Sequence, residues 1–254
     1  MTEKPLILIT NDDSIKAKGI ASLVEAMKPL GDIVVVAPDT VQSGKGHAIT
    51  IHEPLRLKAS NQFEGIESYT CSGTPVDCVK LALYEVLEHR PTLLVSGVNH
   101  GSNAATNVLY SGTMSAAVEG AIENIPSIGF SLLDFDENAD FDASMEYAAK
   151  LATMVLENNL QKGVCLNVNI PKGRPSDIEG FKICQQGRAY WEDTFDKRKD
   201  PFGGDYFWMT GDYRTTDKGE DTDLWALSHN FVSVVPTQFD MTAHHLISNL
   251  NEWK

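Results

Sequence analysis

The chain has 254 residues, of which 42% are hydrophobic and 22% charged, a balance typical of a folded globular protein. Its formal net charge of −14 repels a nucleic-acid backbone and argues against a polymeric nucleic acid as partner. No apolar run approaches the ~20 residues of a membrane span, and the N-terminus lacks a secretory-signal pattern. We therefore expect a cytoplasmic protein that does not contact a membrane.

The first predicted strand, residues 6–10, is an unbroken apolar run that is followed at once by the adjacent carboxylates Asp12 and Asp13. In an open α/β sheet, ligands bind beyond the carboxyl ends of the strands. Adjacent acidic residues are expected by chance in so acidic a chain. The prediction of a site therefore rests on the position of this pair at the carboxyl end of a strand. The pair is predicted to bind a metal ion; the alternative is that it only caps the following helix.

Strand and helix patterns then alternate along the chain. Apolar positions at helical spacing predict a helix over about 20–30, and Thr74-Pro75-Val76-Asp77 has the N-cap, first-turn proline and N3 acid of a second helix start. Further helices are predicted from Gly112 and from Asp142, which is expected to act as a cap. The other strands are predicted at 33–37, 93–95, 128–132 and 164–170. This order predicts a Rossmann-like, doubly wound α/β fold with a mostly parallel sheet.

The pattern changes between about residues 185 and 223, where the chain becomes polar and rich in aromatic residues. A structureless loop of that length is improbable, so we predict a β-hairpin arm that turns near 201–204. Its aromatic side chains either cover their own subunit or lie on a second one, and the sequence leaves both interpretations open. A strand at 231–235 and a short terminal helix capped by Asp240 complete the chain.

Three further loops are expected at the same sheet edge as the acidic pair. The strand at 33–37 leads to Ser43 and Gly44, where glycines allow backbone N–H groups to approach a ligand closely. The strand at 93–95 leads to Asn99 and Asn103. A third loop opens a helix with Ser111-Gly112-Thr113, which offers the hydroxyls and free backbone donors that hold a phosphate.

The residue types at this edge indicate a particular chemistry. Two carboxylates, a serine hydroxyl and an asparagine carbonyl are hard oxygen ligands that suit Mg²⁺ or Mn²⁺ rather than zinc. Such an ion polarises a phosphoryl oxygen and lowers the pKa of a bound water, while helix donors stabilise the transition state. The edge therefore predicts hydrolysis of a phosphate ester, although each element taken alone also fits an ordinary turn or cap.

Five ordered blocks resemble the conserved blocks of the SurE family, the stationary-phase survival nucleotidases. These blocks are ILITNDDS, VVVAPDTVQSGKGHAITIHEPLRL, CSGTPVDCVKLAL, LLVSGVNHGSNAATNVLYSGTMSAAVEGA and TDLWALSHNFVSVVPTQFDMT. The resemblance implies a phosphatase that depends on one divalent cation per subunit, Mg²⁺ or Mn²⁺. The implied substrates are nucleoside 5′- and 3′-monophosphates and, in some members, short polyphosphate.

The same resemblance implies roles for individual residues. The family's metal ligands match Asp12, Asp13, Ser43 and Asn99, and its phosphate contacts match Asn103 and Ser111-Gly112-Thr113. The implied fold is a Rossmann-like core whose carboxyl-terminal part joins subunits through exchanged elements. We therefore expect one SurE-like domain over 1–254, with the active site in 1–184 and with 185–254 forming a homodimer or homotetramer.

In the expected mechanism, one of the two catalytic aspartates, Asp12 in preference to Asp13, accepts a proton from the water that attacks phosphorus. One alternative is a haloacid-dehalogenase-type phosphatase with an aspartyl-phosphate, although the usual Asp-x-Asp spacing is absent. Another is a non-catalytic nucleotide sensor, against which the complete ligand set argues. The absence of a GxGxxG motif after the first strand and of a P-loop makes a dehydrogenase or an ATPase a poor fit.

Overall fold

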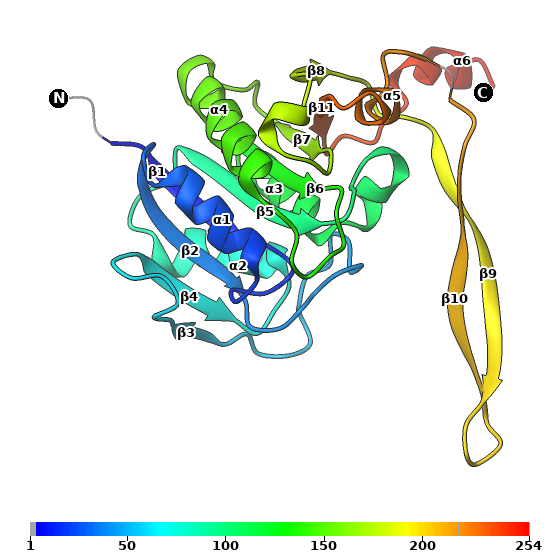
Figure 1. The fold of residues 1–254 in the computed structure, drawn as a ribbon, viewed down its shortest axis with the longest axis horizontal. Helices are drawn as coiled ribbons and strands as arrows, with labels where there is room; N and C mark the ends of the chain where they lie inside the picture. Colours follow the sequence, from blue (N-terminus) through cyan, green and yellow to red (C-terminus); the bar gives the residue numbers. More distant parts are fainter. Residues whose placement is uncertain (1–3, 218, 254) are drawn as a thin grey trace.

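The computed structural model describes residues 4–217 and 219–253. Within these residues, a nine-stranded sheet has the order β3-β4-β2-β1-β5-β6-β7-β11-β8, and helices cover both of its faces (Figure 1). The strands of this sheet are β1 (Leu6–Thr10), β2 (Asp32–Pro38), β3 (Leu57–Ala59), β4 (Glu67–Cys71), β5 (Leu93–His100), β6 (Ser127–Leu132), β7 (Val164–Ile170), β8 (Phe181–Ile183) and β11 (Val232–Gln238). The α-helices are α1 (Lys18–Met27), α2 (Pro75–Leu81), α3 (Gly112–Ile122), α4 (Asp142–Asn158), α5 (Asp223–Ser228) and α6 (Ile247–Asn251). None of the described helices has the length and apolar character needed to cross a membrane.

The strand order places a topological switch at the centre of the sheet. Strands β4, β2, β1, β5, β6 and β7 run parallel, while β3 and β11 are antiparallel to their neighbours in that set. The chain builds outward from β1 to β2 and β4 on one side and then returns to place β5 on the other. In such sheets the crevice between β1 and β5 is where ligands bind. The predicted Rossmann-like, mostly parallel fold is confirmed.

The first strand is apolar throughout because both faces of the sheet are buried. Ile7 and Ile9 pack with α1 and α4 in one core cluster, and Leu8 packs with α2 and α3 in a second. All three side chains are fully buried. Burial of such a side chain contributes about 1.5–3 kcal/mol, so β1 is anchored firmly between two layers of helices.

The helices predicted from Gly112 and Asp142 begin at those residues, but of the three predicted helix caps one agrees with the structure and two fail. Thr74 Oγ1 accepts a hydrogen bond from Asp77 N, and the Asp77 carboxylate accepts one from Thr74 N, so the predicted capping box of α2 is confirmed. The capping role predicted for Asp142 is wrong, because Phe141 is the N-cap residue of α4. The role predicted for Asp240 is also wrong, since its carboxylate bonds Thr242 N and the His244 ring before α6 begins.

The predicted arm is a long two-stranded hairpin that projects from the body of the molecule (Figure 1). Strands β9 (Ala189–Lys199) and β10 (Asp205–Thr215) pair along their whole length, and the chain turns at 200–204. Phe202 at the tip is 97% exposed and Trp208 is 59% exposed. These aromatic side chains do not cover their own subunit, which removes that interpretation for the outer part of the arm.

Buried Asp223 joins the root of the arm to the core. Its carboxylate accepts hydrogen bonds of 2.8 Å from the backbone N–H groups of Ala105, Gly187 and Leu224. Burial raises the pKa of this carboxyl, and the three backbone donors oppose that rise. Asp223 therefore fixes the short 3-10 helix η2 (Ala105–Tyr110), the start of the arm and α5 in relation to one another.

Candidate metal and phosphate site

Four loops meet at the carboxyl edge of β1 and β5. Asp12 and Asp13 follow β1, Ser43 lies after β2, Asn99 lies near the end of β5, and Thr113 lies in the first turn of α3. Strand β5 extends five residues beyond the predicted 93–95, and this extension carries Asn99 to the edge. The structure thus brings together the loops that the sequence predicted to share one edge.

Asp12 lies at the bottom of this edge, where it is 3% exposed. Its Oδ1 accepts a hydrogen bond of 2.5 Å from Thr113 Oγ1, and its backbone oxygen accepts one of 2.7 Å from Gln42 N. Burial and, to a smaller extent, the charge of Asp13 raise the pKa of Asp12 to about 6, against the lowering effect of the Thr113 hydrogen bond. A carboxylate in such a place is stabilised in its charged form by a nearby cation.

Asp13 is half-buried beside Asp12 and reaches two other loops. Its Oδ1 accepts a hydrogen bond of 3.3 Å from Ser43 Oγ, and its Oδ2 accepts one of 3.4 Å from the backbone N–H of His100. Among the described residues, neither Asp12 nor Asp13 forms an ion pair with a basic side chain. The two negative charges are therefore left without a cationic partner from these parts of the chain.

The alternative role of the acidic pair as a helix cap is not observed. The N-cap residue of α1 is Ala17, and no side chain caps this helix. Asp12 instead contacts the first turn of α3, and Asp13 contacts the loops after β2 and β5. The pair links loops that are far apart in the sequence rather than ending a local helix.

The amide nitrogen of Asn99 is hydrogen-bonded, while its carbonyl oxygen accepts no hydrogen bond from the described residues. Its Nδ2 donates to the backbone oxygens of His100 at 3.1 Å and Gly101 at 2.9 Å, which fixes the orientation of the amide. In the described ranges no group of three or more His, Cys, Asp or Glu residues could hold a metal. The available donors are instead two carboxylates, the Ser43 hydroxyl and the Asn99 carbonyl. These are hard oxygen donors, and their two negative charges have no basic partner among the described residues. Such a set fits Mg²⁺ or Mn²⁺.

The first turn of α3 lies against the acidic pair. Ser111 caps the helix through a 3.0 Å hydrogen bond from Met114 N to its Oγ, so its hydroxyl proton stays available to another acceptor. Gly112 allows the close approach, because a Cβ atom there would lie 2.8 Å from Asp12 Cβ. The positive end of the helix dipole is thus beside the carboxylates, where an anion such as phosphate is stabilised.

The loop after β2 reaches the same helix start. Gly44 is exposed and has a φ of +74°, a left-handed conformation that glycine adopts without strain. Two residues later, Gly46 N donates a 3.2 Å hydrogen bond to the backbone oxygen of Tyr110, directly before Ser111. The loop carrying Ser43 and Gly44 is thereby held beside the N-terminus of α3.

Asn103 belongs to a buried polar network below the edge. Its Nδ2 donates to Ser131 Oγ at 2.8 Å, its backbone N–H donates to Asn169 Oδ1, and its backbone oxygen accepts from Asn167 Nδ2. The Asn103 Nδ2 group has two hydrogens, and the bond to Ser131 uses only one of them. Asn167 and Asn169 were missed at the sequence level, although their alternation within an apolar strand was a usable signal.

The fold and the edge together define the class of the protein: a Rossmann-like α/β protein with an acidic, hydroxyl-lined site at the switch between β1 and β5, beside a helix N-terminus. The family model described as "Survival protein SurE" matches residues 7–193. The chain belongs to the SurE family, and the resemblance inferred from its sequence blocks is confirmed.

Relatives match the chain over nearly its whole length. The "5'-nucleotidase SurE" of Flavobacterium psychrophilum is 59% identical over 98% of each chain. The "5'-nucleotidase SurE" of Chlorobaculum tepidum is 44% identical over 99% of this chain and 95% of its own. The crystal structure of the SurE protein from Aquifex aeolicus superimposes with a TM-score of 0.84 at 37% identity, covering 98% of this chain and 99% of that one.

Proposed function

We propose that this chain is a 5′-nucleotidase, a metal-dependent phosphomonoester hydrolase that releases phosphate from nucleoside 5′- and 3′-monophosphates, with short polyphosphate as a further substrate. The names of its relatives support the 5′-nucleotidase activity. The observation that carries the proposal is the adjacent pair Asp12 and Asp13, which has no basic partner among the described residues and lies against the first turn of α3.

Four residues are proposed as the ligands of one Mg²⁺ or Mn²⁺ ion: Asp12, Asp13, Ser43 and Asn99. Their support is the hard oxygen character of the set and the fixed amide of Asn99, which presents its oxygen. The ion, when bound, supplies Lewis acidity that polarises a phosphoryl oxygen and increases the acidity of a water.

The phosphate group is proposed to lie over the first turn of α3. Ser111 would donate its hydroxyl proton, and the Gly112 and Thr113 backbone would offer the positive helix end. Gly44 and Asn103 are proposed to complete the contacts, Gly44 through its backbone in the adjacent loop. These donors favour the transition state because negative charge accumulates on the phosphoryl oxygens.

Asp12 is proposed to accept the proton of the attacking water, because it lies in the metal site and contacts the helix start where phosphate binds. Thr113 orients the carboxylate by donating to Oδ1, which leaves Oδ2 for the site. Asp13, which is held by Ser43 and the His100 backbone, is proposed to act as a ligand.

The test is phosphate release from a panel of nucleoside monophosphates, short polyphosphate and p-nitrophenyl phosphate, each with Mg²⁺ or Mn²⁺ and with EDTA. We expect turnover of nucleoside monophosphates that EDTA removes and added Mn²⁺ restores. Activity that survives EDTA would contradict the metal mechanism. Absence of turnover under all conditions would favour a nucleotide sensor, and a covalent aspartyl adduct trapped with beryllium fluoride would favour the haloacid-dehalogenase mechanism.

Residues 185–254 are proposed to join subunits into a homodimer or homotetramer, while 1–184 carries the active site of a single domain. The exposed aromatic side chains of the arm support this, because an isolated two-stranded sheet is marginally stable and such apolar surface is usually covered. Sedimentation of the purified chain is expected to give two or four subunits. A monomer at micromolar concentration would refute the proposal.

A further inference from the structure

The loop after β2 is anchored at both of its ends, and the proposed ligand Ser43 lies between the two anchors. At the first anchor, Gln42 N donates a 2.7 Å hydrogen bond to the backbone oxygen of Asp12. The second anchor is formed by residues 46–47, which contact η2 and α3. The intervening residues 43–45 are exposed, so the position of the Ser43 hydroxyl depends on these two anchors.

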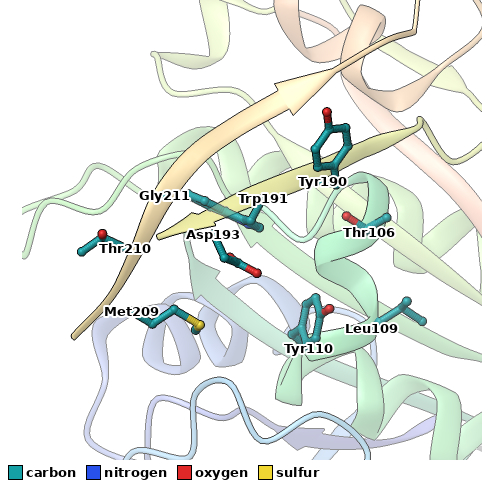
Figure 2. A pocket seen from close by; sticks show the side chains of 9 residues that line it. All are labelled: Thr106, Leu109, Tyr110, Tyr190, Trp191, Asp193, Met209, Thr210 and Gly211. Atoms are coloured by element: carbon teal, nitrogen blue, oxygen red, sulfur yellow. The ribbon is translucent and has the colours of Figure 1, made fainter. Parts of the chain in front are cut away.

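The backbone part of the second anchor contacts the end of η2. Gly46 N donates to the backbone oxygen of Tyr110 at 3.2 Å. The side chains of Leu109 and Tyr110 line the cavity between η2 and the arm, as Figure 2 shows, so η2 meets the loop with its backbone. Gly46 itself has no side chain and a φ of +57°. The side-chain contact at this anchor is therefore made by the next residue, His47.

The partner of His47 is Glu119, a carboxylate of α3 that is 2% exposed. Its Oε2 accepts a 2.9 Å hydrogen bond from His47 Nε2, and its Oε1 accepts one from Lys80 Nζ of α2. Burial acts to raise the pKa of Glu119, but the hydrogen bonds from His47 and Lys80 outweigh burial and lower this pKa below its usual value. Because an ionised carboxylate can only accept, His47 Nε2 carries the hydrogen of the shared bond.

Glu119 lies on the same side of α3 as the acidic pair. Seven residues separate it from Gly112, which corresponds to two turns of helix and about 10 Å along the helix axis. Gly112 borders Asp12, since a Cβ atom at Gly112 would lie 2.8 Å from Asp12 Cβ. Residues 42–47 therefore follow this side of α3, from Asp12 at its first turn to Glu119 two turns later.

We propose that His47 and Glu119 are positioning residues, whose hydrogen bond holds the loop after β2 at the metal site. The loop places the Ser43 hydroxyl beside the acidic pair, where it donates to Asp13 Oδ1 at 3.3 Å. This inference rests on the proposed function, which makes Ser43 a metal ligand. His47 and Glu119 act indirectly, through the position of Ser43. Replacing a side chain that supports a metal ligand typically changes metal affinity or activity by 10–100-fold.

Lys80→Ala is the matched control for His47→Ala. The alternative role of Glu119 is only to stabilise the packing of α2 on α3, and Lys80 contacts the same carboxylate from α2 without belonging to the loop. The side chains of His47 and Lys80 are similarly exposed, 36% and 42%, so each variant removes one partner of Glu119. Glu119 itself is kept, because its loss would leave both partners unpaired.

The first experiment examines the loop without metal or substrate. Amide hydrogen exchange of peptides that cover residues 40–50 is followed by mass spectrometry in EDTA. We expect about 10-fold faster exchange in His47→Ala, because the Gly46 N–H then opens more often from Tyr110, and unchanged exchange in Lys80→Ala. Equal exchange in the wild-type chain and His47→Ala would overturn the proposal, as would equal acceleration in both variants.

The second experiment measures Mn²⁺ binding by calorimetry in the absence of substrate. His47→Ala is expected to bind Mn²⁺ about 10-fold more weakly than the wild-type chain, and Lys80→Ala within about twofold of it. His47→Gln should restore most of the affinity, because its amide can still donate to Glu119. Equal affinity of His47→Ala and the wild-type chain would contradict the proposal, and so would equal weakening in the Lys80→Ala control.

Phosphate release then separates failure of this proposal from failure of the proposed function. His47→Ala keeps all four proposed ligands, so its activity should be about 10-fold lower at limiting Mn²⁺ and return toward that of the wild-type chain at saturating Mn²⁺. The same loss at limiting and saturating Mn²⁺ would overturn the positioning role while leaving the nucleotidase function intact. A wild-type chain that neither binds Mn²⁺ nor releases phosphate would refute the proposed function, and the positioning role with it.

Discussion

Replacing Asp13 with alanine is expected to lower kcat/KM for nucleoside monophosphates on the order of 10³-fold. Asp13 is half-buried and contacts Ser43 and the His100 backbone, so its loss removes a proposed ligand and the link between two loops. The fold should persist, because the hydrophobic core contacts of β1 do not involve this side chain. Phosphate release and circular dichroism of the purified variant measure the two effects.

Asp39→Ala is the matched control for this prediction. Asp39 is an exposed aspartate that follows β2 near the same edge, so its removal changes the net charge by the same amount. It is expected to retain activity within about twofold, as is usual for surface substitutions away from a site. Similar losses in the two variants would show that overall charge, rather than the position of Asp13, accounts for the effect.

Replacing Asp12 with asparagine tests whether Asp12 accepts a proton or has only a structural role. Asparagine keeps the volume of the side chain and can still accept the hydrogen bond from Thr113, but it cannot accept a proton from water. Activity should fall at least about 10²-fold even with saturating Mn²⁺. Full activity under these conditions would refute the assignment of Asp12 as base.

Gly112→Ala is expected to lower kcat by about 10²-fold in a chain that still folds. The added Cβ would lie 2.8 Å from Asp12 Cβ and 2.9 Å from Asp12 Oδ2, so the carboxylate must move. A displacement near 1 Å in a catalytic group costs a factor of this size. Overpacking costs about 1–3 kcal/mol, partly offset by the better helix propensity of alanine, about 1 kcal/mol.

Gly120→Ala tests whether such a loss is specific to the site. It introduces the same methyl group into the same helix, where its Cβ would lie 2.1 Å from Ser127 Oγ on β6. Urea denaturation should show a loss of stability, while kcat of the folded protein should stay close to that of the wild type. If both variants lost kcat equally, crowding of α3 in general would be responsible.

The architecture could be predicted from sequence where local signals agree with the tertiary structure. Runs such as 6–10 are apolar throughout because two layers of helices bury them, and the capping box at Thr74 acts within four residues. The short strands β3 and β8 were missed because much of their surface is exposed and they lack a hydrophobic pattern. The cap predicted at Asp142 was wrong because this residue lies one position later, in the first turn of α4. The cap predicted at Asp240 was wrong because its carboxylate bonds Thr242 N and the His244 ring instead of the start of α6.

Part of the candidate site could also be predicted, because the positions of its residues follow from the predicted strands and helices. Asp12, Ser43, Asn99 and Thr113 each lie near the end or the start of a regular element, so their shared edge follows from the parallel sheet. The polar network around Asn103 was missed, because its partners Ser131 and Asn169 lie 28 and 66 residues away in sequence and only packing in three dimensions brings them together.

The hydrogen bond from Thr113 to Asp12 spans 101 residues of sequence, and β1 pairs with β5 only after β2, β3, β4 and α2 have been synthesised. Contacts of such range bear a large loop-closure entropy and form slowly during folding. A nascent or partly refolded chain can therefore hold much of its helix content before the acidic pair meets α3. Phosphate release would therefore report that these long-range contacts have formed.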